Sequence, residues 1–391
     1  MDGGETEHGL SAGPRTVLYL HSSAGRYGAD RQLALLACGL DPARYRPLVV
    51  LAMDGELRED LAAAGVEVLV RPLAVMRRAS MSPAGLAAIG GALARDAGGL
   101  SRLARARHVA VVHTNTSVTL GGSAAGRVAR IPHVWHLREI YTGFERFWPA
   151  YRRLLLSADA LPCVSQATRV QLGETAKASV LHDGLPLVPA RAERGAARAV
   201  LGLPGDAFVV AILGRISSWK GQDVLIRALA AMGGGDDTIA LVAGEPWRGE
   251  EARLRDLRAL AAELGLAERV RFAGFRSDVE NVYGAADVVA VPSTQPDPFP
   301  NAALEAAAAG CCVVAANHGG LPEMLEDGAT GRLVTPRDPA ALAAALAELR
   351  ADPAARARLG AAAATTTRKR FSPARLLERT QDLYDGLLTE R

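Results

Sequence analysis

The chain has 391 residues, 49% of them hydrophobic, and a formal net charge of +3. This length predicts two well-packed domains, and the small charge excess argues against nucleic acid as the main partner. Four cysteines without metal-ligand spacing indicate reduced core residues of a cytoplasmic protein. No apolar run is long enough to cross a bilayer, and residues 1–15, acidic and glycine-rich, are expected to form a flexible tail rather than a signal peptide.

The first half of the chain alternates apolar, strand-like runs with helical patterns. The runs are TVLYLH at 16–21, PLVVLA, VEVLV, VAVVHTN, PHVWHL, ALPCV and SVLHDG near 184. This alternation is typical of a doubly wound parallel sheet with helices on its faces. We therefore assign residues 16–187 to a first Rossmann-like domain.

The same alternation restarts after a proline-containing linker at 188–206. Its runs are FVVAILG, IALVAG, VRFAG, DVVAVPS, CVVAA and RLV, which predict a second Rossmann-like domain over 207–371. Residues 372–391 carry apolar side chains at helical spacing, and we expect this helix to cross back to the first domain. Two such domains leave a cleft between the carboxyl edges of their strands, where ligands bind.

Residues 292–310, PSTQPDPFPNAALEAAAAG, hold two carboxylates eight positions apart. A helix cannot begin before Pro300, so Asp297 lies in a loop and Glu305 lies on the following helix. The apolar run ahead of Pro292 predicts a buried strand that leads into this loop. Strand ends and helix N-termini of this kind attract anionic ligands. The alternative is a solvated aspartate followed by a surface glutamate.

The stretch GRISSWKGQDVLIRAL follows the strand FVVAILG and places Arg215 and Lys220 around a turn that opens a helix. Both cations would face the cleft and suit a diphosphate. No strand ends in an Asp-x-Asp motif and no His or Cys cluster has metal spacing, so we expect no metal cofactor. Alternatively, Arg215 pairs with a structural carboxylate and Lys220 is solvated.

Four further motifs follow in order, namely AGE at 243–245, VRFAGF at 270–275, PSTQPDPFP with Glu305, and NHGGLPE at 317–323. Together with the preceding GRxxxxKG pattern, this series resembles the retaining GT-B glycosyltransferases of family 4. YGADRQLALLA, ADALPCVSQATR and VLHDGL extend the resemblance loosely into the first half. It implies the GT-B fold, an α/β architecture whose two Rossmann-like domains face each other across a cleft. The first domain would bind an acceptor and the second a nucleotide-sugar donor.

The resemblance also implies roles for individual donor-site residues. Arg215 and Lys220 match the pair that holds the donor pyrophosphate, Glu305 matches the acid that grips the ribose, and Asp297 matches the acid near the donor sugar. The other donor contacts that it implies are Gly28, Gly214, Gly244, Phe275, Arg276, Phe299, Asn301 and Ala302.

The acceptor side is expected around Tyr27, Thr114, Asn115 and Glu139. The family's first-domain histidine falls on Arg138, with His136 two positions earlier; either could face the reacting sugar, and His136 could equally be a core residue. FERFWPAYRRLLL at 144–156 interleaves aromatic and basic residues. It could make weak peripheral contact with a membrane, or it could be an ordinary amphipathic helix with an arginine face.

Three positions depart from the family pattern: Asp297 stands in place of glutamate, Pro300 in place of glycine, and Tyr27 in place of the first of two glycines. The expected function is retaining, metal-independent transfer of a sugar from a UDP- or GDP-type donor to a hydroxyl of a small-molecule or lipid-linked acceptor. The enzyme would be cytoplasmic, either free or at the inner face of the membrane. Two alternatives stay open: a pseudo-glycosyltransferase or sugar-nucleotide epimerase, and a catalytically silent nucleotide-binding protein.

Overall fold

The computed structural model describes residues 13–77, 80–233, 237–246 and 249–389. It forms two compact units. The first comprises the described residues up to Leu137, Phe147–Pro162 and the described residues from Leu377 onward, and the second comprises Arg138–Arg146 and Cys163–Leu376. Of the expected N-terminal tail, residues 1–12 lie outside the described part of the chain. None of the helices in the described ranges is both long and apolar enough to span a membrane.

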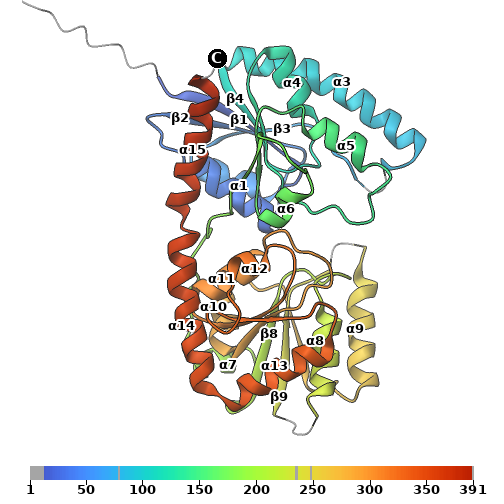
Figure 1. Cartoon of the computed structure of the whole chain (residues 1–391), viewed down its shortest axis with the longest axis vertical. Coiled ribbons are helices and arrows are strands. Elements are labelled where there is room, and N and C mark those ends of the chain that lie inside the picture. Colours follow the sequence, from blue (N-terminus) through green and yellow to red (C-terminus); the bar gives the residue numbers. More distant parts are fainter. Residues whose placement is uncertain (1–12, 78–79, 234–236, 247–248, 390–391) are drawn as a thin grey trace, which may run out of the picture. The chain divides into compact units, whose positions relative to one another are not determined.

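The first unit contains a five-stranded parallel sheet in the order β3-β2-β1-β4-β5. Its strands are β1 (Arg15–His21), β2 (Tyr45–Leu51), β3 (Glu67–Val70), β4 (Val109–Thr114) and β5 (His133–Trp135). The helices of the first unit up to residue 155 are α1 (Gly28–Gly39), α2 (Glu56–Ala63), α3 (Pro83–Ala106), α4 (Gly121–Ala129) and α5 (Trp148–Leu155). Helices α3 and α4 lie side by side (Figure 1). The strand order reverses between β1 and β4, which is where open α/β sheets bind ligands.

The runs ALPCV and SVLHDG differ from the prediction, because they do not continue this sheet. They form β6 (Leu161–Cys163) and β7 (Ala178–Val180), which pair with each other in a separate two-stranded sheet, with α6 (Gln166–Val170) between them. The segment around β6 stays connected to β5 by an isolated bridge between Val134 and Ala160 and by hydrogen bonds from the Trp135 and Leu137 N–H groups to the carbonyls of Ala160 and Pro162, at 2.9 and 2.8 Å. Pro162 has no N–H to donate, which limits the ladder that β6 could form.

The second unit contains six parallel strands in the order β10-β9-β8-β11-β12-β13. They are β8 (Phe208–Leu213), β9 (Thr238–Ala243), β10 (Val270–Gly274), β11 (Val288–Val291), β12 (Cys312–Ala316) and β13 (Arg332–Val334). Its helices are α7 (Arg194–Val200), α8 (Gln222–Ala231), α9 (Glu251–Glu263), α10 (Val279–Ala285), α11 (Asn301–Ala308), α12 (Leu321–Met324), α13 (Pro339–Ala351) and α14 (Pro353–Arg370). The prediction of two Rossmann-like parallel sheets is confirmed.

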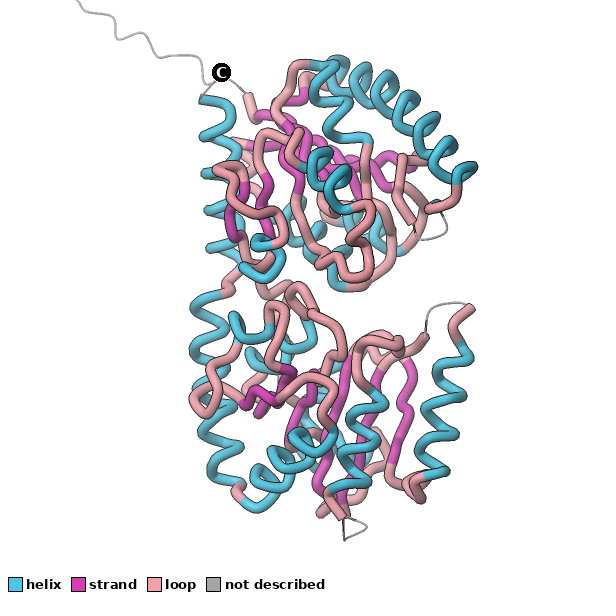
Figure 2. The backbone as a smooth tube through the Cα atoms, turned by 45° about the vertical axis from the view of Figure 1, so that its right-hand side comes forward, coloured by secondary structure: helices cyan, strands magenta, loops and turns pink. Residues whose placement is uncertain are grey.

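The central strands β8, β9, β11 and β12 of this second sheet are buried on both faces. Val209 and Ala211 of β8 pack into one hydrophobic cluster, whereas Val210 and Ile212 of the same strand pack into another. Figure 2 shows helices on both sides of these strands. Burial on both faces explains why the strands appear in the sequence as continuous apolar runs rather than as alternating patterns.

The C-terminal helix α15 (Pro373–Thr389) belongs to the first unit from Leu377 onward. The Tyr384 hydroxyl lies 3.0 Å from that of Tyr19 and 2.5 Å from Nδ1 of His113. The side chain of Gln381 accepts a hydrogen bond from the Asp41 N–H. Buried polar contacts therefore fix the last turns of this helix against β1 and β4.

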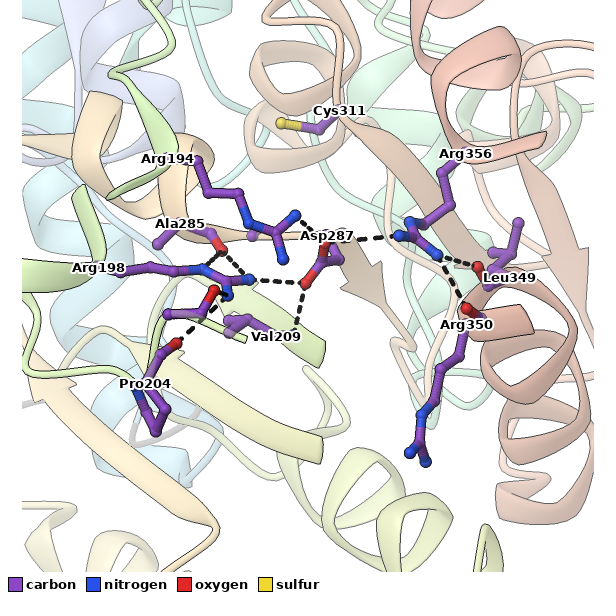
Figure 3. Close-up of polar contacts among 12 residues, drawn as sticks. Arg194, Arg198, Pro204, Val209, Ala285, Asp287, Cys311, Leu349, Arg350 and Arg356 are labelled. Atoms are coloured by element: carbon purple, nitrogen blue, oxygen red, sulfur yellow. Dashed lines mark hydrogen bonds and ion pairs between the residues drawn. The ribbon is translucent and has the colours of Figure 1, made fainter. Parts of the chain in front are cut away.

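A buried carboxylate ties several elements of the second unit together. Asp287, just before β11, lies between Arg194 and Arg198 on one side and Arg356 on the other (Figure 3). Its oxygens lie 2.6 Å from Arg194, 2.8 Å from Arg198 and 3.7 Å from Arg356, and one of them accepts the Val209 N–H at 2.8 Å. These contacts connect β8, β11, α7 and α14 at the amino ends of the strands.

Candidate active site

The loop from β8 to α8 carries the predicted cations. Lys220 Nζ lies 2.7 Å from Oδ2 of Asp297 and 4.1 Å from the centre of the Trp219 ring. Arg215 lies in the same loop, and its carbonyl accepts a hydrogen bond from the Gln222 side chain at 3.0 Å. Lys220 is thus ion-paired rather than solvated, while 21% of its side chain stays exposed.

The loop after β11 holds Asp297, of which only 3% is exposed. The Ser293 hydroxyl donates to the Asp297 carboxylate at 3.4 Å, and the Asp297 carbonyl accepts from the Gly320 N–H at 2.8 Å. The NHGGLPE segment therefore packs directly against this loop. The interpretation of Asp297 as a solvated aspartate is wrong.

Helix α11 begins at Asn301, directly after Pro300 in an extended conformation, as the proline pattern predicts. Glu305 lies one turn into this helix and is 4% exposed, so it is not a surface residue. The Tyr283 hydroxyl donates to its carboxylate at 3.3 Å. A carboxylate held in this way is preorganised to accept hydrogen bonds from a ligand.

Two neighbouring strands contribute Gly244 and Phe275. Gly244 follows β9 with φ 150°, and a Cβ there would lie 1.9 Å from the carbonyl oxygen of Gly214, so only glycine lets these loops meet. Phe275 follows β10 and is 57% exposed, while its N–H donates to Glu245 at 3.4 Å. Arg276 forms an ion pair with Asp278.

These residues share one edge of the second sheet. Arg215, Lys220, Gly244, Phe275 and Asp297 all follow carboxyl ends of the parallel strands β8 to β11. Such an edge, with helix N-termini opening onto it, suits an anionic ligand. Among the described residues, no group of three or more His, Cys, Asp or Glu side chains is placed to hold a metal ion.

Sequence reasoning missed the contacts that support this edge. His182 stacks on Phe299 with ring centres 5.2 Å apart, and its Nε2 lies 2.9 Å from Glu323. Glu323 belongs to the NHGGLPE motif and also accepts the N–H groups of Gln166 and Ala167 at 2.8 and 3.0 Å. The motif singles out Glu323, but no local sequence signal indicates that His182, 141 residues away, is its partner.

In the first unit, the predicted acceptor residues fall into two groups. Thr114 and Asn115, at the end of β4, are fully buried. Thr114 Oγ1 lies 2.8 Å from Nε2 of His133, and Asn115 Nδ2 lies 3.2 Å from Nδ1 of His21. Tyr27 and Gly28, in contrast, are exposed at the start of α1.

A network that the sequence did not suggest holds this turn. Asp30 accepts hydrogen bonds from the Tyr27 N–H at 3.0 Å and from the Ser23 hydroxyl at 2.5 Å, and His21 Nε2 lies 2.9 Å from its carboxylate. Burial by itself would raise the pKa of Asp30, but the hydrogen bonds outweigh burial and lower it. A charged Asp30 therefore anchors the loop that carries Tyr27 and Gly28.

The structure separates the two residues considered for the reacting sugar. His136 is fully buried in the first unit, with its ring 5.5 Å from that of His113, which favours its interpretation as a core residue. Arg138 belongs to the second unit and forms an ion pair with Asp183. Glu139 accepts the Arg138 N–H at 3.1 Å.

The helix within FERFWPAYRRLLL is amphipathic. Tyr151 and Leu155 of α5 are buried, whereas Arg152 and Arg153 are more exposed. This pattern fits an ordinary helix that packs on its own unit.

The two sheets, with the strand orders given above, define a GT-B glycosyltransferase fold. Residues 26–187 match the family model described as Glycosyltransferase Family 4, and residues 193–366 match the model described as Glycosyl transferases group 1. The chain belongs to this family of glycosyltransferases, family 4.

Curated relatives include two enzymes named D-inositol 3-phosphate glycosyltransferase. The one from Mycolicibacterium vanbaalenii is 38% identical over 259 residues, which cover 63% of this chain and 55% of the relative. The one from Saccharomonospora viridis is 43% identical over 198 residues, which cover 49% of this chain and 46% of the relative. The chain thus spans about half the length of the curated relatives it matches.

Solved structures extend the similarity over nearly the whole chain. HepE of Anabaena in complex with UDP aligns with a TM-score of 0.81 and 27% identity, over 95% of this chain and 100% of that one. The structure of the same protein with UDP-glucose aligns with a TM-score of 0.80 and 28% identity, over 95% of this chain and 99% of that one. Sucrose-phosphate synthase of Thermosynechococcus elongatus aligns with a TM-score of 0.76 and 21% identity, over 96% of this chain and 100% of that one. At this identity the similarity supports the fold alone.

Proposed function

We propose that this protein is a retaining glycosyltransferase that moves a sugar from a nucleotide-diphosphate sugar to a hydroxyl of an acceptor, without a divalent ion. The observation that carries the proposal is the edge of the second sheet where Arg215 and Lys220 share a loop beside the N-terminus of α8. A diphosphate placed there would meet two cations.

The donor is proposed to be of the UDP type. HepE, 27–28% identical to this chain, has been solved with UDP and with UDP-glucose. In the proposed complex, the Glu305 carboxylate accepts hydrogen bonds from the ribose and the exposed Phe275 ring lies near the base. Asp297 lies toward the sugar.

Catalysis in this proposal depends on charge. As the bond from the sugar to the diphosphate breaks, the sugar becomes oxocarbenium-like and negative charge grows on the departing phosphate. Arg215 and Lys220 stabilise that charge. The acceptor attacks from the face that the nucleotide leaves, and a phosphate oxygen takes the acceptor's proton, so no side-chain nucleophile is needed.

The acceptor is proposed to bind the first unit, near the turn at Tyr27 and Gly28. The name of the curated relatives makes inositol 3-phosphate the first acceptor to test. A lipid-linked acceptor is the second choice, and sedimentation with anionic vesicles at low salt would test for the peripheral contact that it requires.

The proposal is tested by incubating the protein with UDP- and GDP-sugars, with and without inositol 3-phosphate, in the presence of a chelator. We expect nucleotide release that requires an acceptor, and a glycoside that retains the donor's anomeric configuration by NMR. A sugar nucleotide that isomerises without an acceptor would indicate an epimerase. Nucleotide binding without any turnover would indicate a catalytically silent protein. As a control, UDP at 100 times its Kd should stabilise the fold by about 2.7 kcal/mol.

A further inference from the structure

A buried ion pair joins two segments that lie far apart in the sequence. Arg138 pairs with Asp183, 45 residues further on, and their side chains are 5% and 6% exposed. Both residues belong to the second unit, and Arg138 directly follows Leu137, the last residue of the first unit's N-terminal segment. The pair therefore fixes the point where the chain enters the donor-side unit.

The residue next to Asp183 in the sequence packs against the loop that carries Asp297. His182, the neighbour of Asp183, stacks on Phe299 at 5.2 Å with an angle of 28° between the rings. Phe299 is two residues after Asp297, which pairs with Lys220. Contacts therefore run from Arg138 through residues 182–183 to the loop after β11.

The segment that carries Asp183 is held on both sides. Leu185 donates its N–H to the Phe371 carbonyl at 2.8 Å, and His182 Nε2 lies 2.9 Å from Glu323. Asp183 thus has little freedom to move away from Arg138. An aspartate held in this way can fix both the position and the rotamer of a guanidinium.

A buried pair of this kind does not by itself explain stability. The free energy needed to remove two charges from water offsets much of the free energy gained from their attraction. An apolar pair of similar size often gives the fold the same stability. A fixed positive charge beside a site for a sugar diphosphate, in contrast, contributes wherever negative charge develops.

We infer that Asp183 is a positioning residue, which holds the Arg138 guanidinium beside the Asp297 loop so that its charge acts on the donor during transfer. This inference rests on the proposed function. It assigns the role to the pair rather than to Arg138 alone, and it predicts that Asp183 affects turnover without touching the donor.

Two variants test the inference. Asp183→Asn leaves the Arg138 charge buried without its anionic partner. The double variant Arg138→Gln with Asp183→Asn replaces the pair by two neutral side chains that can still bond to each other. Glu348→Gln, which breaks the exposed pair with Arg332 in the same unit, is the control. The melting temperature, the Kd for UDP, and the kcat and KM for the donor sugar nucleotide are measured for each.

We expect Asp183→Asn to lower kcat at least tenfold while the Kd for UDP changes less than threefold. The double variant should recover most of the melting temperature but keep the low kcat, and the control should match the wild type. A double variant with wild-type kcat would overturn the inference, because the pair would then serve only the fold. If Asp183→Asn does not fold, a wild-type kcat in the double variant would still overturn the inference. An inactive wild-type protein would overturn the proposed function itself, and this inference with it.

Discussion

Strand β11 has a buried aspartate near each end, and the two are held very differently. Asp287, just before the strand, is paired with three arginines and accepts the Val209 N–H. Asp297, in the loop after the strand, is paired with Lys220 and accepts from Ser293.

The difference lies in the partners rather than in the carboxylates. Arg198, opposite Asp287, has 1% of its side chain exposed, whereas Lys220, opposite Asp297, has 21% exposed. The Arg198–Asp287 pair is closed to solvent and belongs to the cluster that connects four elements. The second leaves its cation within reach of a ligand, so the same strand supplies a structural pair at one end and a proposed binding pair at the other.

Removing Asp287 should have the largest effect on the fold. Asp287→Ala leaves the buried Arg198 without its anionic partner, and we expect it to lower the free energy of unfolding by about 3–5 kcal/mol. Urea denaturation measures this loss. Asp256→Ala, at an exposed position of α9, is the control and should change stability by less than about 0.5 kcal/mol. Equal stability of the two variants would contradict a structural role for the Asp287 cluster.

Arg215→Ala should have the largest effect on turnover. Removing one preorganised donor costs about 3–4 kcal/mol, or about 10² to 10³ in rate, so kcat should fall at least tenfold. Arg227→Ala, at an exposed position of α8, removes an arginine outside the proposed site. Initial rates for both, with melting temperatures close to the wild type, separate catalysis from folding. A wild-type rate for Arg215→Ala would remove this residue from the mechanism.

Asp297→Asn should have an intermediate effect and sharpen the contrast with Asp287. The amide keeps the shape of the side chain but no longer neutralises Lys220, which then interacts more strongly with a diphosphate. We expect UDP to bind at least as tightly as in the wild type, while kcat falls about tenfold because the sugar contact is changed. Weaker UDP binding would show instead that the carboxylate helps to hold Lys220 in place.

Glu323→Gln should have the smallest effect and should appear mainly in the pH dependence of stability. Burial would raise the pKa of Glu323, but hydrogen bonds from His182 and from the Gln166 and Ala167 N–H groups outweigh it and lower the pKa below 4.5. Because the folded-state pKa lies below the unfolded value, the stabilisation is present above about pH 4.5 and is lost as the pH falls through the folded value.

The variant should therefore be less stable by about 1 kcal/mol at pH 7, and this difference should shrink toward pH 3. Urea midpoints measured across that range test the sign. A difference that grows on acidification would be the opposite of the expected result.

The sequence predicts the strands of the second unit well, because their two buried faces produce continuous apolar runs. The prediction that β6 and β7 belong to the first sheet is wrong. Each strand has only three residues, and so short an apolar pattern does not define the strand's partner. The start of α11 was predicted because Pro300 determines it locally.

The candidate site was predicted as a set of residues but not as a set of contacts. The motifs single out Lys220 and Asp297, yet no local signal shows that side chains 77 residues apart form an ion pair. Thr114 and Asn115 end the apolar run VAVVHTN, but their contacts with His133 and His21 arise only in the fold. Long-range pairing of polar side chains is what periodicity cannot show.

In the proposed function, the carboxyl edge of the second sheet binds the diphosphate of the donor through Arg215 and Lys220. Calorimetric titration of UDP in the presence of a chelator, into the wild type and into Arg215→Ala, tests it directly. We expect saturable binding to the wild type and at least tenfold weaker binding to the variant, a difference of about 1.4 kcal/mol. No heat of binding to the folded wild type, or the same affinity in both proteins, would contradict it.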